Sequence, residues 1–460
     1  MLHNYKRIHF IGIGGTGMSG IAKILLEMGY DVSGSDLKNS EIIDRLRKMG
    51  AQIYIGHEPS NVDGSDLVVV SSAIPDENLE LVAARKSGIK ILHRADVLGL
   101  LMKEKRSIAV TGAHGKTTTT SMMSLILEKN NFDPTILIGG ELNDIGGNAS
   151  LGKGKYIVTE ADESDGSFLK LNPDIVVVTN IENDHLDYYK TMDNLLNAFE
   201  TFIEKIPDHG FAVVGVDNEN VSNLIKEIPD KNIISFGINT KADYTAAEIE
   251  FKGLKTFFSV LYKDQKLGEI HLQVPGLHNV YNAIASCALG HQIGLTMDKI
   301  SSSLKDFTGV QRRFQIVGSF DNIKIIDDYG HHPTEIKATL SAAKNCKPAR
   351  IVAVFQPHRY TRTHNLYQEF GDAFTDADVV ILTDIYSAGE KPIPGVSAAL
   401  IKDSIESKTK KEVIFIENKD NIVNFLTQIL QPGDFILTIG AGDVWKVSKD
   451  LVNKLNKMTA

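Results

Sequence analysis

Short apolar runs, rich in β-branched residues, recur along the chain, and most are followed by glycine or acidic residues and then by a segment with helical periodicity. This alternation is typical of parallel strands joined by helices that cover the sheet, so we expect an α/β fold. Strands are predicted in three groups: 7–13, 31–34 and 67–70; then 107–110, 156–159, 175–179 and 211–216; and finally 324–326, 350–355, 379–382, 413–416 and 435–439. Amphipathic helices are predicted over 18–28, 41–49 and 117 to about 129.

The three groups of strands predict three domains. The chain has 460 residues, which agrees with domains of roughly 150 residues each. No linker rich in proline or serine and no low-complexity segment separates the groups. The strands alone therefore set the expected domains, which are 1–95, 96–312 and 313–460.

The composition is that of an ordinary globular protein, with 42% hydrophobic and 23% charged residues. Acidic residues outnumber basic ones by 58 to 49, and the net charge of −9 disfavours nucleic acid or an anionic membrane as a partner. Cys287 and Cys346 are too few for a disulfide framework, which fits a reducing compartment. Because no apolar run approaches the ~18 residues of a membrane span, we expect a cytoplasmic protein without membrane insertion.

A glycine-rich segment, GIGGTG at 12–17, follows the first predicted strand and precedes a helix, and Asp36 lies at the end of the next strand. Glycines let the backbone approach a diphosphate, the helix N-terminus offers free N–H groups, and a carboxylate can accept hydrogen bonds from ribose hydroxyls. The pattern favours a nucleotide diphosphate over a purely structural turn. It leaves open which nucleotide binds, NAD included.

A second loop, TGAHGKTT at 111–118, lies between a predicted strand and a helix. Val110 stands where the general phosphate-loop pattern has its first glycine, so the match is incomplete. The chemistry still applies, because Lys116 can place a charge beside the β and γ phosphates and the Thr117 hydroxyl can ligate Mg²⁺. We expect this loop to bind a nucleoside triphosphate.

Acidic residues crowd the end of the following strand, in EADESD at 160–165. Taken alone, such a run is more often a solvated turn, but beside a phosphate loop its oxygen atoms suit Mg²⁺, with Glu160 nearest the strand. The next strand, 175–179, leads into NIENDH at 180–185, and His185 is either a metal or phosphate ligand or an exposed loop histidine.

Three later segments carry further candidates. Asn279 and Asn282 lie three residues apart on a predicted helix, where they could pair with a nucleotide or simply cap and decorate the helix. The third group of strands supplies RR at 312–313, DDYGHHP at 327–333 and QPHRYTR at 356–362. Arginine and histidine at the mouth of one sheet favour an anion-binding site over ordinary surface charge.

Taken together and in order, eight segments resemble the Mur ligases of bacterial cell-wall synthesis: GIGGTGMSG, TGAHGKTTTT, EADESDGSF, NIENDHLD, GLHNVYNA, GVQRRF, DDYGHHPTE and FQPHRYTRT. The resemblance extends from Gly12 to about Gly442 and is closest to the branch that adds L-alanine. It implies a Rossmann-like N-terminal domain for a UDP-sugar, a central P-loop ATPase with a mostly parallel sheet, and a Rossmann-like C-terminal domain for the amino acid. The first glycine-rich loop would then bind the diphosphate of UDP, not NAD.

The resemblance also implies roles for individual residues. ATP would be bound by Gly112, Ala113, His114, Gly115, Lys116, Thr117, Thr118, Asn279, Asn282, Arg313 and Asp328. The metal would be held by Thr117, Glu160 and His185, and the UDP-sugar by Gly14, Gly15, Thr16, Gly17, Asp36 and His57. Alanine would be held or oriented by Tyr329, His331, His358, Arg359 and Arg362. Direct parts in catalysis would fall to Lys116, His185, His331 and Arg359.

Two positions depart from the family pattern. Ala113 stands where the phosphate loop of the family often has threonine, which should matter little because the loop acts through its backbone. Several sister ligases use a modified lysine about 15 residues after the position of His185, where this chain has Glu200. Lys190 and Lys205 are out of register, and the alanine-adding branch resembles this chain in lacking that lysine.

The implied reaction is ATP-dependent amide formation between L-alanine and the lactyl carboxylate of UDP-N-acetylmuramate, with Mg²⁺ and an acyl-phosphate intermediate. We expect a monomer or a homodimer. Three other interpretations stay open on the sequence: a related ligase that adds a cell-wall tripeptide or another amino acid, an NAD-dependent oxidoreductase, and a nucleotide-dependent sensor without catalysis.

Overall fold

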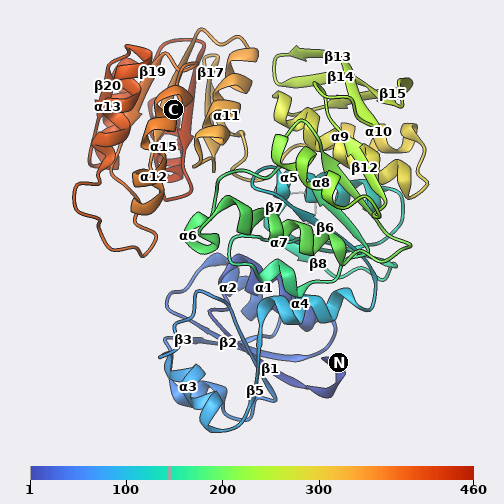
Figure 1. Ribbon diagram of the computed structural model, residues 1–460. Helices are drawn as coiled ribbons and strands as arrows, with labels where there is room; N and C mark the ends of the chain where they lie inside the picture. Colours follow the sequence, from blue (N-terminus) through green and yellow to red (C-terminus); the bar gives the residue numbers. More distant parts are fainter. Residues whose placement is uncertain (1, 143–146, 460) are drawn as a thin grey trace. The chain divides into compact units, whose positions relative to one another are not determined.

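The computed structural model describes residues 2–142 and 147–459. Within these residues the chain forms three β-sheets with helices on their faces (Figure 1). The chain divides into two compact units, which are described separately. Unit 1 comprises Met1–Ala247, Ser259–Ile270 and Tyr281–Lys305, and unit 2 comprises Glu248–Phe258, His271–Val280 and Asp306–Ala460.

The first sheet has five parallel strands in the order β3-β2-β1-β4-β5. The strands are β1 (Arg7–Ile11), β2 (Asp31–Asp36), β3 (Gln52–Ile55), β4 (Leu67–Val70) and β5 (Lys90–His93). The helices are α1 (Thr16–Glu27), α2 (Glu41–Lys48), α3 (Leu79–Lys86) and α4 (Arg94–Met102), with 3-10 turns η1 (Leu2–Asn4) and η2 (Pro59–Val62). Because β1 lies between β2 and β4, the strand order reverses at its carboxyl end, which is where open α/β sheets bind ligands.

The second sheet has ten strands in the order β15-β14-β13-β12-β11-β10-β6-β9-β7-β8. Its strands are β6 (Arg106–Thr111), β7 (Thr135–Leu142), β8 (Gly147–Ser150), β9 (Tyr156–Glu160), β10 (Ile175–Val178), β11 (Phe211–Gly215), β12 (Ile233–Phe236), β13 (Tyr244–Lys252), β14 (Lys255–Tyr262) and β15 (Gln265–Leu272). The helical segments are α5 (Lys116–Lys129), η4 (Ser167–Lys170), α6 (Leu186–Tyr189), α7 (Met192–Glu204), α8 (Glu219–Glu227), α9 (Leu277–Gln292) and α10 (Met297–Lys305). Strand β6 pairs in parallel with both β10 and β9, so a second reversal of strand order lies at its carboxyl end.

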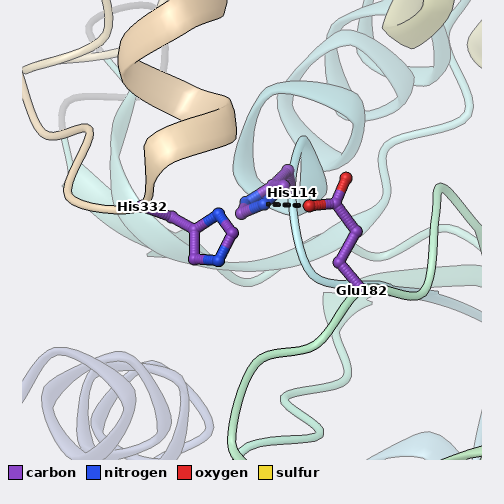
Figure 2. A group of neighbouring side chains, drawn as sticks. All are labelled: His114, Glu182 and His332. Carbon is purple, nitrogen blue, oxygen red and sulfur yellow. Dashed lines mark hydrogen bonds and ion pairs between the residues drawn. The ribbon is translucent and has the colours of Figure 1, made fainter. Parts of the chain in front are cut away.

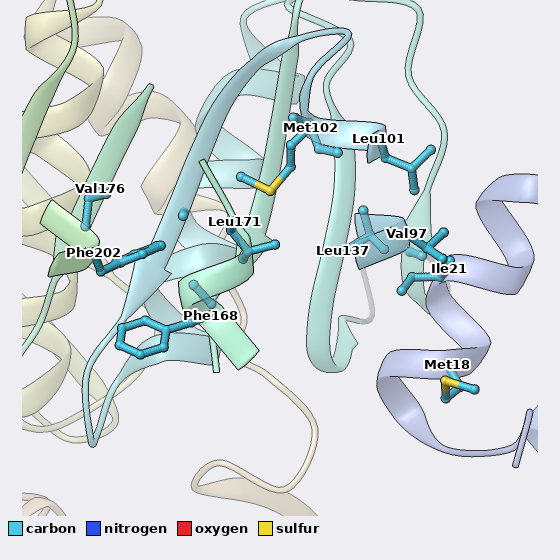
Figure 3. Packing of buried hydrophobic residues seen from close by; sticks show 14 of the residues in the cluster. Met18, Ile21, Val97, Leu101, Met102, Leu137, Phe168, Leu171, Val176 and Phe202 are labelled. Atoms are coloured by element: carbon cyan, nitrogen blue, oxygen red, sulfur yellow. The ribbon is translucent and has the colours of Figure 1, made fainter. Parts of the chain in front are cut away.

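One continuous hydrophobic core joins these two sheets within unit 1. Helices α1 and α4 supply Ile21, Val97 and Leu101, which are buried in the same cluster as Leu137 of β7 and Leu171 beyond η4 (Figure 3). Burial of large aliphatic side chains contributes about 1.5–3 kcal/mol each. The glycine-rich end of α1 is therefore held firmly against the central sheet.

The third sheet lies in unit 2 and has the order β16-β17-β21-β18-β19-β20. Its strands are β16 (Gln315–Phe320), β17 (Ile323–Asp328), β18 (Arg350–Phe355), β19 (Val379–Leu382), β20 (Val413–Phe415) and β21 (Asp434–Ile439). Helices α11 (Pro333–Asn345), α12 (Tyr360–Ala373) and α13 (Ala398–Thr409) contribute to one buried cluster, whereas α14 (Lys419–Ile429) and α15 (Trp445–Thr459) contribute to another. The sheet thus has a core on each face.

The predicted α/β class and the three groups of parallel strands are confirmed, with differences of one to a few residues at most ends. Antiparallel pairs also depart from the parallel pattern, among them β7 with β8 and β16 with β17. Only Asp321 and Asn322, both with positive φ, connect β16 to β17, and a two-residue turn can join only antiparallel strands. Among the described residues, no helix has the length and apolar character needed to cross a bilayer.

Candidate active site

The loop between β6 and α5 has the form of a phosphate-binding loop. Gly112 adopts φ +128°, and a Cβ atom at this position would clash with Thr179 Oγ1, so only glycine fits. Thr179 Oγ1 also donates a hydrogen bond to His114 O at 2.6 Å and fastens the loop from the neighbouring strand's end. No side chain of the described residues caps the N-terminus of α5 at Gly115. The N–H groups of its first turn are thus available to an anion.

Lys116 lies at the start of α5 and makes a short ion pair with Glu163. Its Nζ donates to Glu163 Oε1 at 2.7 Å and to Gly112 O at 2.7 Å. Burial would lower the pKa of the Lys116 amine, but the carboxylates of Glu163 and Asp162 outweigh this effect and hold the pKa above its ordinary value. Lys116 is therefore a fixed cation in this loop with Glu163 as its partner, and its contact with the phosphates of ATP stays a prediction.

Oxygen atoms suited to a divalent cation meet at the same edge of the sheet. The Thr117 side chain hydrogen-bonds the Glu160 carboxylate, which also accepts from Gly139 N at 2.7 Å. Burial raises the pKa of Glu160, against the lowering effect of the Gly139 amide and Lys116. A hydroxyl and a carboxylate are hard ligands that fit Mg²⁺. His185 Nε2 instead lies 3.7 Å from Glu163 Oε1, so the structure places it beside the partner of Lys116.

His114 makes specific contacts on the outer side of the loop. Its ring Nε2 lies 3.2 Å from Glu182 Oε2 (Figure 2). Its backbone N donates to Asn180 Oδ1 at 2.9 Å. The third side chain drawn in Figure 2, His332, begins helix α11, where its ring accepts a hydrogen bond from Thr334 N. The segment 180–185 thus supports the phosphate loop as well as carrying His185.

The two asparagines of α9 make different contacts. Asn282 Oδ1 accepts a hydrogen bond from Thr119 Oγ1 at 3.1 Å and lies against Gly115, which places it at the phosphate loop. The Asn279 amide donates to Pro275 O at 2.7 Å and is buried. Asn282 therefore lies at the loop where a nucleotide contact is predicted. Asn279 uses at least one N–H of its side-chain amide to hold the backbone just before α9. Both nucleotide contacts stay predictions.

In the first sheet the loop 12–15 is closed by its own backbone and by Asp36. Gly12 N donates to Ser35 O at 2.8 Å, and Gly14 N donates to Asp36 Oδ2 at 3.0 Å. A carboxylate can accept several hydrogen bonds, so the predicted contact with a ribose remains possible in geometry. The edge that carries Asp36 also carries His57, because Gly56 N donates to Asp36 O at 2.9 Å.

Glu80 organises the residues behind His57. Its carboxylate is fully buried and accepts from Ser35 Oγ at 2.5 Å and from Asn61 Nδ2 at 2.5 Å. His57 Nδ1 lies 3.3 Å away and His9 Nε2 3.5 Å away. Burial would raise the pKa of Glu80, but the hydrogen bonds from His9, Ser35 and Asn61 lower it to about 2. The predicted substrate residue His57 is thus fixed by a buried anion.

We expect Glu80 to make stability depend on pH. Its pKa is about 2 in the folded protein against 4.5 for a free side chain, so folding is favoured while the carboxylate is ionised. This contribution, about 3 kcal/mol, is complete above the unfolded pKa and is lost as pH falls toward 2. Chemical denaturation of wild type and Glu80→Gln between pH 7 and pH 3 measures it. The stability gap between them should narrow with acid, and a constant gap would contradict the assignment.

The predicted clusters of the third sheet come together at its carboxyl edge, with the ring centroids of His331 and His358 5.7 Å apart. Tyr329 packs edge-on against His331, and Tyr386 stacks on His358 with ring planes 11° apart. Burial, together with the nearby positive charge of Arg362, lowers the pKa of His331 to about 3 and that of His358 to about 4. Both imidazoles are therefore uncharged at neutral pH.

Two arginines complete this cluster. Arg362 Nη1 lies 3.3 Å from His358 Nδ1. Arg359 immediately precedes α12 and has φ +73°, and its Nε is buried without a hydrogen-bond partner in the part of the chain that the structure describes. A buried donor of this kind is costly unless a ligand accepts from it. The arrangement suits a small carboxylate.

Asp328 and Arg313 contact other groups of the same unit. Asp328 accepts from Phe314 N at 2.8 Å and from Gly330 N at 2.7 Å, and burial raises its pKa although Arg313 lowers it. Arg313 Nη1 donates to Glu335 Oε1 at 3.1 Å. Their predicted contacts with ATP stay predictions.

Sequence reasoning missed three charged residues that these contacts reveal: Glu80, Glu163 and Glu335. Glu335 could have been found, because it lies three residues after the helix-starting His332 and forms a capping box with it. Glu163 was inside the acidic run but was indistinguishable there from its neighbours. No local pattern marks Glu80, since its partners come from four other segments.

Three protein-family models match segments of the chain. They are the Mur ligase family, catalytic domain, over residues 7–106, the Mur ligase middle domain over 110–290, and the Mur ligase, glutamate ligase domain over 312–442. The predicted boundary after residue 95 falls inside α4, and the boundary after 312 falls at the start of the third segment. The exact domain limits stay predictions.

Similar proteins extend this match over nearly the whole chain. The UDP-N-acetylmuramate–L-alanine ligases of Pelotomaculum thermopropionicum and Geotalea daltonii are 53% and 50% identical to it, over 98% and 99% of this chain and 98% and 100% of theirs. The crystal structure of UDP-N-acetylmuramate-alanine ligase from Thermotoga maritima matches with a TM-score of 0.84 and 32% identity, covering 98% of this chain and 99% of that one. With the phosphate loop, the acidic edge and the histidine-arginine cluster in place, the chain belongs to the Mur ligase family.

Proposed function

We propose that this protein is an ATP-dependent ligase that joins L-alanine to the lactyl carboxylate of UDP-N-acetylmuramate and releases ADP and phosphate. The observation that carries the proposal is the phosphate loop with its buried Lys116–Glu163 pair, on a chain 53% identical to a ligase of that name. Such a reaction supplies precursors of peptidoglycan. That the protein acts as a monomer or a homodimer stays a prediction.

The first step is phosphoryl transfer at the carboxyl edge of the central sheet. An oxygen of the substrate carboxylate attacks the γ-phosphorus, the bond to the β-bridging oxygen breaks, and ADP leaves. Lys116 and the N–H groups of the first turn of α5 offset the charge on the transferring phosphoryl group. The product is an acyl phosphate, which is a far better acyl donor than a carboxylate.

Mg²⁺ is the metal that we propose for this step, and Thr117 and Glu160 are the residues that would hold it. When bound, the ion offsets negative charge on the β and γ phosphates. The hard oxygen donors of these two side chains support Mg²⁺ over a softer metal. His185 lies 3.7 Å from the same Glu163 oxygen that Lys116 contacts, where it would help to orient the partner of Lys116.

The second step needs the amine of alanine in its uncharged form. The nitrogen attacks the acyl carbon, and phosphate leaves as the tetrahedral intermediate collapses to the amide. We assign the alanine carboxylate to Arg359 and Arg362, since Arg359 Nε has no partner within the described chain. The uncharged rings of His331 and His358 can accept hydrogen bonds from the incoming amine, and Tyr329 packs beside them.

The test is phosphate release by the purified protein with ATP and Mg²⁺, with UDP-N-acetylmuramate and L-alanine added separately and together. We expect release only when both are present, and a nucleotide product heavier by one alanyl residue. Release that required a tripeptide in place of alanine would keep the ATP chemistry and overturn the alanine assignment. If no mixture released phosphate and the protein bound NAD(H), the proposal as a whole would be overturned.

A further inference from the structure

A cavity of about 200 Å³ lies within unit 1, between the glycine-rich end of α1 and the acidic edge of the central sheet. Its walls include Thr16 and Gly17 on one side and Glu160 and Asp162 on the other. Apolar side chains from α4 and β7 also line it. The cavity thus connects the loop assigned to the UDP diphosphate with the edge assigned to phosphoryl transfer.

Arg94 lies in this cavity and touches both sides. A Cβ atom on Gly17 would lie 2.5 Å from Arg94 Nη1, so the guanidinium packs directly on the first turn of α1. Arg94 Nη2 lies 3.5 Å from Asp162 Oδ2, which is a loose ion pair. The absence of a side chain at Gly17 therefore makes room for Arg94, a function that differs from contact with a diphosphate.

Most of the hydrogen-bonding capacity of Arg94 remains available. A guanidinium has five N–H donors. Within residues 2–142 and 147–459, Arg94 makes one ion pair, with Asp162. Its side chain is 24% exposed and lines the cavity. A planar fork in this position can bind a carboxylate through two parallel hydrogen bonds.

The charges around the cavity favour a cation beside any anionic substrate group. Glu160 and Asp162 repel a carboxylate that approaches the phosphoryl-transfer edge. Among the described residues that line the cavity, Arg94 is the one basic side chain. It can offset this repulsion and orient the carboxylate toward the phosphate loop.

We propose that Arg94 binds the carboxylate that becomes phosphorylated, and so selects a UDP-sugar that carries an acid group over one that does not. This inference rests on the proposed function, whose acceptor is a carboxylate. Arg94 then explains how a negatively charged acceptor reaches an edge rich in acidic side chains. It also explains why position 17 is glycine, because a side chain there would clash with Arg94.

The experiment compares the binding of three nucleotides, UDP, UDP-N-acetylglucosamine and UDP-N-acetylmuramate, to wild type, Arg94→Gln and Arg94→Lys by calorimetry without ATP. The first two ligands share the diphosphate but lack the lactyl carboxylate. We expect Arg94→Gln to weaken UDP-N-acetylmuramate about tenfold or more and to leave the other two within about twofold. Arg94→Lys should keep part of the preference because it keeps the charge. Arg85→Gln removes an exposed arginine of α3 as a matched control and should change none of the three.

Each other outcome overturns the inference in a recognisable way. An equal loss for all three ligands would assign Arg94 to the diphosphate, and no loss for any would make it structural. Thermal unfolding of each variant separates a loss of binding from a loss of folding. Failure of wild type to bind any of the three nucleotides would instead overturn the proposed function.

Discussion

Replacing Lys116 with alanine should lower turnover by about three orders of magnitude while binding of the UDP-sugar stays within about twofold. The reason is that Lys116 is the buried cation of the phosphate loop, held by Glu163 Oε1 at 2.7 Å, whereas the UDP site is assigned to the first sheet. Steady-state phosphate release measures the first quantity and calorimetry with UDP-N-acetylmuramate measures the second.

The control is Lys129→Ala, which makes the same change at an exposed position in the last turn of the same helix. Its turnover should equal that of wild type. Near-normal turnover in Lys116→Ala would show that the loop 112–118 does not handle the transferred phosphate. Loss of UDP-sugar binding in the same variant would show instead that the two sites depend on each other.

Glu163→Gln should lower turnover by about a hundredfold, although Glu163 touches no substrate in the proposed reaction. The substitution removes the carboxylate that does most to raise the pKa of Lys116 against burial, so that pKa should fall. A lower pKa means that the ammonium loses its proton sooner as pH rises. The high-pH limb of the rate profile should therefore move to lower pH, which a series of rate measurements across the alkaline range will detect.

Glu204→Gln, at an exposed position on α7, is the matched control and should leave the profile unchanged. A lower rate with an unshifted alkaline limb would mean that Glu163 supports the loop only through packing. An unchanged rate would contradict the role of the ion pair. Thermal unfolding of both variants should be measured as well, because removing one partner of a buried pair also lowers stability, typically by about 3–5 kcal/mol.

Much of the architecture could be predicted from the sequence, because strands and helices leave a local periodic signal. The run 350–355 and the helix after Gly115 appear in the structure almost as expected. The hairpin of β16 and β17 was missed, although Asp321-Asn322 is a turn sequence, because β16 alternates weakly between buried and exposed positions. Short strands at sheet edges are defined by their partners more than by their own residues.

The candidate site was predictable where its chemistry is carried by neighbouring residues. Glycine, lysine and threonine act together in 112–118 because one loop and one helix turn hold them all. His331 and His358 were expected at one sheet mouth, since both follow parallel strands, and their rings are 5.7 Å apart. Contacts between segments were not predictable in this way: Glu160 was expected nearest the strand and as a metal ligand, but nothing indicated that Glu163 would turn inward to Lys116.

The sequence by itself determined the order of the elements, the two glycine-rich loops, and the positions of lysine, histidine and arginine at the ends of strands. These features depend on contiguous residues, whose backbone preferences act locally. Only the tertiary structure decided which charges pair: Lys116 with Glu163, Glu80 with His57, and Arg94 with Asp162. The partner of a side chain depends on the conformation of the loop after its strand and on the residues packed beneath that loop. Both are determined by how the whole core packs.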